Sequence, residues 1–275
     1  MNRLSLEDRA RILGCLVEGN SLRAITRMTG NSINTVTKML VDLGTACAIY
    51  QNETLRNLPC KRVQVDEIWS FCYSKKKNTP VHLRGLGKGD VWTWVGIDAD
   101  TKLVPGWLVG DRDSDCAKVF IDDLAGRLKN RVQLTSDGLK LYLQAVEDSF
   151  GAKIDYAMLV KTYGPSYGDQ QERRYSAGEC CGAIKGTVCG NPEEGHVSTS
   201  FVERQNLTMR MSMRRFTRLT NGFSKKVENH AHAVAIHYMH YNFGRIHKSL
   251  RVTPAMQAKV SDHVWTLEEI AKLAD

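Results

Sequence analysis

The chain has 275 residues and a mass of 30.9 kDa, with 42% hydrophobic and 25% charged residues, so a packed core is feasible and wholesale disorder is disfavoured. No apolar run approaches the ~18 residues that span a bilayer, and the first residues, which include Glu7 and Asp8, lack the apolar segment of a signal peptide. Membrane and secreted proteins are therefore disfavoured, and we expect a cytoplasmic protein whose eight cysteines are reduced thiols.

The net charge of +8 is unevenly distributed. Between Arg204 and Arg251 the chain carries ten Lys or Arg residues and a single acid, Glu228, whereas the remainder has 28 basic and 29 acidic residues. A concentrated cationic segment predicts a polyanionic partner, most commonly nucleic acid. The alternative is a solvated helix face, but such a face usually mixes both signs.

Residues 1–58 are expected to form short helices. Ser21 can cap one helix, whose apolar positions are Leu22, Ile25 and Met28, and Gly30 with Asn31 supplies a tight turn. A second helix then opens at Ser32 or Asn34, and its inward positions are Ile33, Val36, Met39 and Leu40.

Two short helices joined by a glycine-containing turn form a helix-turn-helix. Its outward polar and basic side chains suit base edges and phosphates, and we predict DNA contacts from Asn31, Asn34, Thr35 and Lys38. The alternative is an ordinary αα-hairpin. The polar stretch at 51–59 is expected to be a linker.

The middle of the chain alternates between strand and helix patterns. Strands are predicted at 62–72, 91–98, 103–110, 132–137 and 153–160, with helices at 114–128 and 139–150. The order βββαβαβ is followed by a long irregular stretch and further helices. This order predicts an α/β fold (an α+β mixed sheet) with helices on its faces.

Three acids lie at positions in this order where they could meet at one site. Asp66 lies within the first strand, Asp137 ends the fourth, and Glu203 lies in the first turn of a later helix. The first and fourth strands can lie side by side, and the later helix can pack across them. Clustered carboxylates repel one another unless cations neutralise them, and hard oxygen ligands suit Mg²⁺ or Mn²⁺. Two such ions ~4 Å apart can serve phosphodiester chemistry.

Each acid also has a structural interpretation. Asp66 could lie at a strand edge, Asp137 with Gly138 could form a turn, and Glu203 could pair with Ser200 in a capping box. Glu67 is a competing acid, but strand alternation predicts that it points to the opposite face of the sheet from Asp66.

Three blocks resemble those of bacterial DDE-type transposases, with the insertion-sequence-one family the nearest match. The blocks are Val65-Asp66-Glu67-Ile68-Trp69, Thr135-Ser136-Asp137-Gly138 and Phe201-Val202-Glu203-Arg204-Gln205-Asn206. The segments at 207–226 and 241–255 are similar to the same family and to the end of retroviral-integrase-like cores. Asp137 and Glu203 are 66 positions apart, which exceeds the compact integrase spacing, so an insertion is expected at about 162–197.

The resemblance implies an RNase H-like catalytic domain over 59–250, after a helix-turn-helix domain over 1–58 and before a C-terminal tail over 251–275. It implies that Asp66, Asp137 and Glu203 are catalytic ligands of two Mg²⁺ (or Mn²⁺) ions, and that Arg210, seven positions after Glu203, holds a DNA phosphate. The other arginines predicted to bind DNA are Arg214, Arg215 and Arg218.

The function implied is metal-dependent cleavage at insertion-sequence ends and 3′-OH strand transfer into target DNA. The partners would be double-stranded terminal inverted repeats and target DNA, with a homodimer or higher assembly on DNA, no membrane, and a prokaryotic, nucleoid-associated location. The alternatives are a catalytically inactive, sequence-specific DNA-binding regulator derived from such a transposase, and a tyrosine recombinase using Tyr238 or Tyr241.

Several cysteines and histidines remain. Cys180, Cys181, Cys189 and His196 could together hold Zn²⁺, but no standard ligand spacing is present, so idle or buried thiols are favoured. The pair His237 and His240 has no acid nearby and is interpreted as hydrogen-bonding or phosphate-binding rather than metal-binding.

Overall fold

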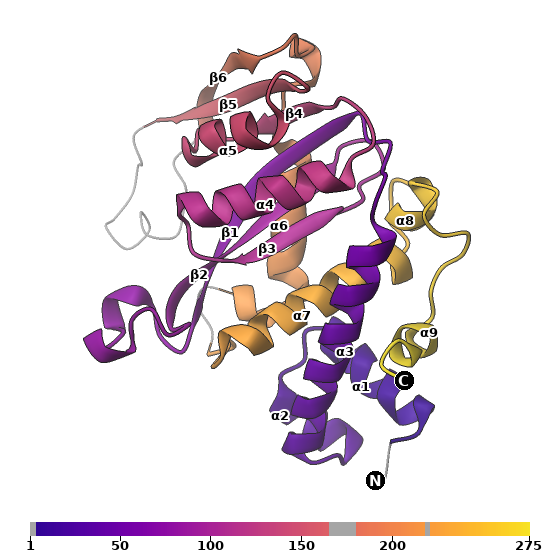
Figure 1. Cartoon of the computed structure of the whole chain (residues 1–275). Helices are drawn as coiled ribbons and strands as arrows, with labels where there is room; N and C mark the ends of the chain where they lie inside the picture. The colour runs from indigo at the N-terminus through magenta and orange to yellow at the C-terminus, as the bar shows by residue number, and fades with distance from the viewer. Residues whose placement is uncertain (1–3, 165–179, 218–220) are drawn as a thin grey trace.

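The computed structural model describes residues 4–164, 180–217 and 221–275, and its centre is one six-stranded mixed sheet (Figure 1). The strands lie in the order β3-β2-β1-β4-β5-β6. Their bounds are β1 Arg62–Cys72, β2 Gly89–Asp98, β3 Gly106–Gly110, β4 Gln133–Ser136, β5 Asp155–Tyr163 and β6 Cys180–Cys189.

Strand pairing confirms that the first and fourth predicted strands are neighbours. β1 pairs antiparallel with β2 and parallel with β4, and β4 pairs parallel with β5. The first five strands and their intervening helices are consistent with an RNase H-like core.

The prediction that the chain is irregular after the fifth strand, through the expected insertion at about 162–197, is wrong in part. β6 lies within that range and pairs antiparallel with β5. The strand lines the open edge of β5, whose backbone groups would otherwise lack partners within the sheet.

Helices cover both faces of the sheet (Figure 1). One face carries α4 (Ser114–Arg127) and α5 (Leu141–Phe150), and the other carries α6 (Ser200–Ser212) and α7 (Val227–Met239). Strand alternation separates the two layers. Val65 and Trp94 belong to the cluster that includes α4 and α5, and Ile68 packs with the residues of α6 and α7.

The N-terminal helices are α1 (Leu6–Val17), α2 (Leu22–Thr29) and α3 (Ile33–Thr54). Ser5, Ser21 and Ser32 cap them through side-chain oxygens, and Gly30 at φ 73° ends α2. α3 is longer than predicted, and it includes the first residues of the expected linker. Gln51 is buried there, and its Nε2 donates to Ala235 O at 3.1 Å.

Two apolar positions in these helices differ from prediction. Met28 and Ile33 were expected to point inward, but their exposed fractions are 49% and 41%. Met28 lies in the last turn of α2 and Ile33 in the first turn of α3, and the end of a helix has few neighbours to pack against. Of the remaining predicted inward positions, Ile25, Val36, Met39 and Leu40 are buried and Leu22 is half-buried.

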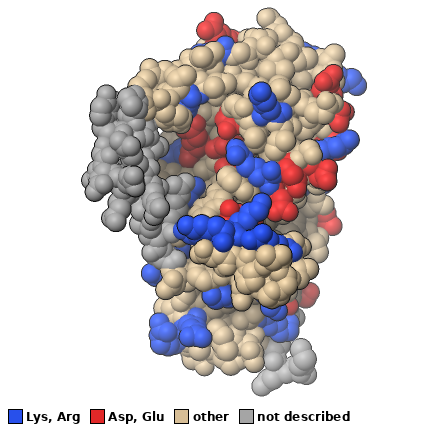
Figure 2. All heavy atoms as spheres, turned by 90° about the vertical axis from the view of Figure 1, so that its left-hand side faces the viewer, with Lys and Arg blue, Asp and Glu red and all other residues tan. Residues whose placement is uncertain are grey.

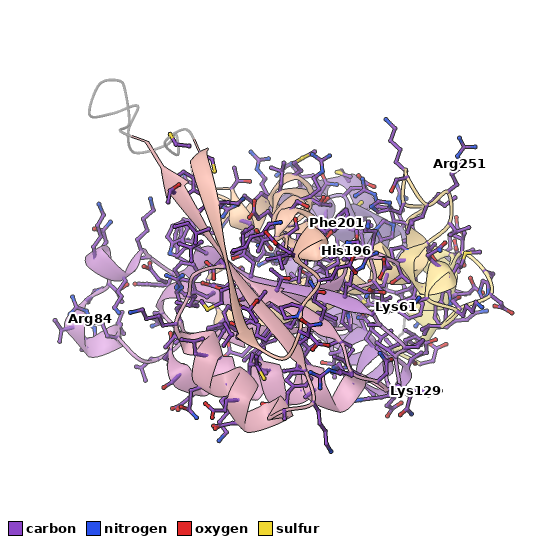
Figure 3. All side chains as sticks on the ribbon, turned by 90° about the horizontal axis from the view of Figure 1, so that it is seen from above. Lys61, Arg84, Lys129, His196, Phe201 and Arg251 are labelled. Carbon is purple, nitrogen blue, oxygen red and sulfur yellow. The ribbon has the colours of Figure 1, made fainter. Side chains whose placement is uncertain are left out.

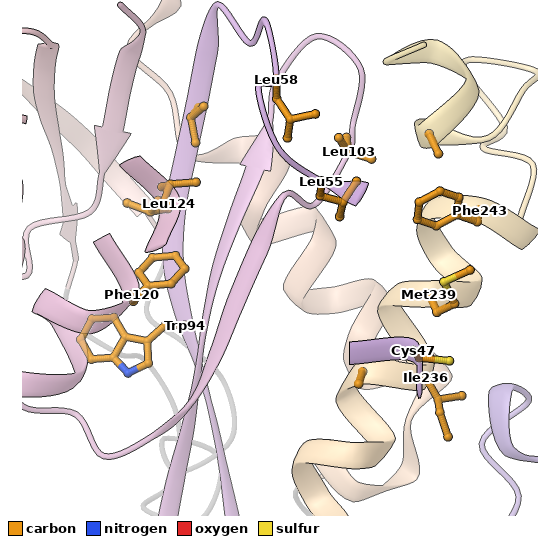
Figure 4. Packing of buried hydrophobic residues seen from close by; sticks show 14 of the residues in the cluster. Cys47, Leu55, Leu58, Trp94, Leu103, Phe120, Leu124, Ile236, Met239 and Phe243 are labelled. Atoms are coloured by element: carbon orange, nitrogen blue, oxygen red, sulfur yellow. The ribbon is translucent and has the colours of Figure 1, made fainter. Parts of the chain in front are cut away.

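One large apolar cluster joins α3, α7 and the sheet layer (Figure 4). Its members include Cys47, Leu55, Leu58, Trp94, Leu103, Phe120, Leu124, Ile236, Met239 and Phe243. The C-terminal segment also contributes, because α9 (Leu267–Lys272) buries Ile270 and Ala271, and Arg9 Nη1 donates to Ala271 O at 3.2 Å. Among the described helices, none combines the length and the apolar composition needed to cross a membrane.

Gly44 sets the approach of α3 to α7. A Cβ added there would lie 2.7 Å from His232 Cα and 2.8 Å from His232 O, so the backbones themselves would have to separate. We expect Gly44→Ala to lower the free energy of unfolding by about 2–3 kcal/mol, since overpacking outweighs the better helix propensity of alanine.

Gly126→Ala in α4 is the matched control. Its nearest neighbour would be Arg56 Nη1 at 3.7 Å, which is ordinary contact. Its stability in urea unfolding should equal that of the wild type or exceed it by up to about 1 kcal/mol. Equal stability of Gly44→Ala and the wild type would contradict the close helix packing.

Candidate metal centre and nucleic-acid interface

Asp66 and Asp137 are brought together by the parallel pairing of β1 and β4. Val65 pairs with Ser136, the last residue of β4. Asp66 follows Val65 within β1, and Asp137 follows Ser136 directly after the end of β4. β4 ends there, which leaves this end of the sheet open beside β1. Asp137 Oδ1 accepts from Leu139 N at 2.9 Å, and this turn holds its carboxylate at the strand end.

Glu67 lies beside these two acids. The sequence pattern did not predict this proximity. Oxygen atoms of Asp66, Glu67 and Asp137 all lie within 4.8 Å of one another. Strand alternation holds, since Asp66 contacts α6 and Glu67 contacts α5. Because Asp137 lies past the end of β4, it is close to both faces, and the longer Glu67 side chain reaches toward it. The proximity of Glu67 to Asp137 follows from the register of β1 on β4, which the sequence alone does not give.

Glu67 is held on the α5 face by two partners. Arg112 Nη2 lies 2.6 Å from Glu67 Oε1, and Tyr142 OH donates to Oε2 at 3.1 Å. Burial, followed by the charge of Asp137, raises the pKa of Glu67, and the Arg112 contacts oppose that rise. The carboxylate is only 1% exposed, so it is closed to a large ligand.

α6 is tied to β1 beside Asp66. Gln64 Oε1 accepts from the backbone N–H groups of Phe201 (2.8 Å) and Val202 (3.1 Å), which are unpaired at a helix start. One turn after Glu203, Asn206 Nδ2 donates to Asp66 Oδ2 at 2.8 Å. These contacts fix α6 across the open end of the sheet.

Glu203 lies on this helix with its carboxylate engaged. Lys161 Nζ on β5 lies 2.6 and 2.5 Å from its two oxygens, and Thr199 Oγ1 donates to Oε1 at 2.6 Å. The alternative interpretation of Glu203 as the partner of Ser200 in a capping box is wrong, because α6 begins at Ser200 and Thr199 is the N-cap. Glu203 is near enough to Asp66 that its charge contributes to raising the Asp66 pKa.

The electrostatics at Asp66 favour a cation. Burial, and then the charges of Glu67 and Asp137, raise the pKa of Asp66 to about 7. Asn206 Oδ1 is buried and has no hydrogen-bond partner among the described residues. Hard oxygen donors in a region that disfavours unbalanced negative charge fit Mg²⁺ or Mn²⁺.

The predicted arginines lie in different settings. Arg210 lies seven residues after Glu203 on α6, about 10 Å along the helix and partly buried. Arg214 is exposed, whereas Arg215 Nη1 donates to Ser224 Oγ at 2.7 Å, and burial lowers the Arg215 pKa. Arg218 lies outside the described residues.

The residues predicted to contact DNA in the helix-turn-helix lie at the start of α3. Asn34 is exposed, Thr35 Oγ1 is 2.9 Å from Ser32 Oγ, and Lys38 forms an ion pair with Asp42 one turn on. Asn31 is half-buried in the turn before the helix.

The cysteine and histidine positions do not converge. Cys180 and Cys189 are at opposite ends of β6, about 30 Å apart for nine residue steps. His196 Nδ1 lies 2.6 Å from Arg62 Nη1. His237 is buried, and burial, followed by His240 and Arg245, lowers its pKa to about 3. Within the described ranges, the only group of three acids, cysteines or histidines that could hold a metal is Asp66, Glu67 and Asp137.

The surface beside the carboxylates carries both charges. Figure 2 views the side that is on the left in Figure 1, and it shows acidic side chains inside a hollow above a band of Lys and Arg. A polyanion on this face would meet the band of cations beside the acidic hollow.

We compared the chain with known protein families, curated proteins and solved structures. No family model and no curated protein matches the chain. Among solved structures, the chain is similar to a piggyBac transposase synaptic complex with hairpin DNA, at 9% identity and a TM-score of 0.39, over 99% of this chain and 71% of that chain. A TM-score of this size does not establish a common fold.

Proposed function

We propose that this protein is a metal-dependent DNA transposase that cleaves at the ends of an insertion sequence and transfers the 3′-OH ends to target DNA. The observation that carries the proposal is the meeting of Asp66 and Asp137 at the ends of adjacent parallel strands, with the Glu203 helix anchored across them. The three sequence blocks that resemble DDE-type transposases fall on these same elements.

In this proposal Asp66, Asp137 and Glu203 hold two Mg²⁺ (or Mn²⁺) ions, which would supply Lewis-acid activation of the phosphodiester. Asn206 orients Asp66, and the pair of Arg112 and Tyr142 orients Glu67 at the edge of the centre. Arg210 binds a phosphate near the reacting one, and the polar and basic residues around the start of α3, Asn31, Asn34, Thr35 and Lys38, contact the duplex.

The buried tyrosines support a metal-dependent reaction over a tyrosine recombinase. Tyr238 is fully buried, and its hydroxyl donates to Met209 Sδ at 3.2 Å. Tyr241 is 5% exposed, and its hydroxyl donates to Lys102 O at 3.0 Å. Neither hydroxyl can reach a phosphodiester without rearrangement of the core.

The test uses end-labelled duplexes from the DNA that flanks the coding sequence, chosen for short inverted repeats. We expect nicks with free 3′-OH ends in Mg²⁺ and none in EDTA. Binding to these ends without cleavage in Mg²⁺ or Mn²⁺ would identify the inactive, sequence-specific regulator instead. Cleavage in EDTA with protein covalently attached to the DNA would identify a tyrosine recombinase.

A further inference from the structure

A basic arm leaves the sheet between β1 and β2. We define the arm as residues 73–88, which contain two short turns, η1 (Lys76–Asn78) and η2 (Val81–Leu83). β1 and β2 stay paired as far as Cys72 and Gly89, whereas β4 leaves β1 after Val65 and β3 pairs with β2 only from Trp92. A two-stranded ribbon therefore carries the arm away from the body, as Figure 1 shows at the left.

The arm is ordered by hydrogen bonds within it and by contacts with residues at its base. Thr79 is buried, and its hydroxyl donates to Lys75 O at 3.1 Å and lies 2.8 Å from Ser74 Oγ. Lys76 N donates to Asp90 Oδ1 at 2.9 Å. At the base of the arm, a Cβ added to Gly87 would lie 2.6 Å from Val227 Cγ1, so the returning chain is packed on α7. A preorganised arm loses little conformational freedom on binding.

The arm carries charge of one sign only. It has five Lys or Arg residues and no acid. Lys76, Lys77 and Arg84 are exposed, whereas Lys75 lies over the rings of Trp69 and Phe71 at 5.8 and 5.9 Å. A merely solvated loop usually mixes charges of both signs. The positive charge of this protein is therefore not confined to the segment from Arg204 to Arg251.

β1 carries both Asp66 of the candidate metal centre and, past Cys72, the arm. The band of Lys and Arg below the acidic hollow in Figure 2 crosses the face from which the arm projects in Figure 1. Cys72 lies six residues beyond Asp66 on β1, about 20 Å away. That distance is less than one turn of duplex DNA, about 34 Å, so one duplex can contact both.

We propose that the arm is a second DNA-contacting surface, which binds phosphates on the duplex that enters the metal centre. The inference rests on the proposed function for the identity of the polyanion, and it assigns to the arm the task of holding the duplex within one turn of the reacting phosphodiester. Phosphate contacts of this kind position DNA without reading its sequence.

The test compares two variants of equal net charge. Lys76→Glu/Lys77→Glu reverses two arm cations, and Lys61→Glu/Lys129→Glu reverses two exposed cations on the side opposite Arg84, as Figure 3 shows. Binding of a fluorescein-labelled 30-base-pair duplex of arbitrary sequence is measured by anisotropy across salt concentrations. Lys76→Ala/Lys77→Ala removes the same contacts without repulsion, and melting curves check that every variant folds.

For both arm variants we expect the slope of log K against log salt to be shallower than that of the wild type by about 1.8, the value for two phosphate contacts. The charge-reversed arm variant should also bind at least tenfold more weakly in low salt, while the control keeps the wild-type slope. Equal slopes for arm and control variants, or a changed oligomer size in sedimentation with unchanged DNA binding, would overturn the arm assignment. A wild-type protein that does not bind the duplex would instead refute the proposed function.

Discussion

The Asp137→Asn variant should lose at least about 10³-fold of the DNA cleavage rate, equivalent to about 4 kcal/mol of transition-state stabilisation. Asp137 is one of the two acids brought together by the β1–β4 register, and an amide cannot replace the charge that a carboxylate brings to a divalent cation. Single-turnover nicking in Mg²⁺ measures the loss.

Glu147→Gln is the matched control, because Glu147 is an exposed acid on α5 outside the carboxylate group. Its cleavage rate should stay within about twofold of the wild type. If Asp137→Asn also kept the wild-type rate, Asp137 would not hold a catalytic metal.

The same assay separates the two candidates for the third carboxylate. DNA must approach the ion, and Glu203 is 41% exposed while Glu67 is 1% exposed. We therefore expect Glu203→Gln to cost about as much as Asp137→Asn. Glu67→Gln should cost about 10–100-fold, the usual range for a residue that orients ligands. The reverse ranking would transfer the third ligand position to Glu67.

Local patterns predicted the strands well, because alternation is a property of consecutive residues. The predicted strand 62–72 matches β1 at both ends, and the chain order correctly predicted its contact with β4. Asp66 and Asp137 could be placed together for this reason alone.

Tertiary contacts of single side chains could not be predicted in this way. Nothing in the sequence indicates that Lys161 on β5 reaches Glu203, or that Gln64 caps α6 from a neighbouring strand. The polar end of α3 has the composition of a linker. The contact that buries Gln51 there, with Ala235 O in α7, is 184 residues away and leaves no local pattern in the sequence. β6 lacked a recognisable pattern because it is exposed along most of its length, so its residues do not alternate between core and solvent.

The Asp66→Asn variant should be more stable than the wild type without divalent metal. The Asp66 carboxyl has a pKa near 3.8 when unfolded and about 7 when folded, because burial and then Glu67 and Asp137 disfavour its charge. The folded state thus holds the proton more tightly, so wild-type stability falls as pH rises from about 4 to about 7 and stays low above that. This difference between the folded and unfolded pKa corresponds to about 4 kcal/mol, and partial solvent access reduces the expected gain to about 2 kcal/mol.

Thermal melting in EDTA at pH 8 should show Asp66→Asn melting about 5 °C above the wild type, with the difference vanishing near pH 4. Mg²⁺ at 100 times its Kd should stabilise the wild type by about 2.7 kcal/mol and the variant much less, since the variant lacks a ligand. Asp100→Asn is a control in which the expected change in melting temperature has the opposite sign. The Arg62 hydrogen bond lowers the Asp100 pKa, so loss of the Asp100 carboxylate should lower the melting temperature at pH 8 regardless of Mg²⁺. A wild type that gains nothing from Mg²⁺ or Mn²⁺ would show that the three carboxylates do not bind these ions in the free protein.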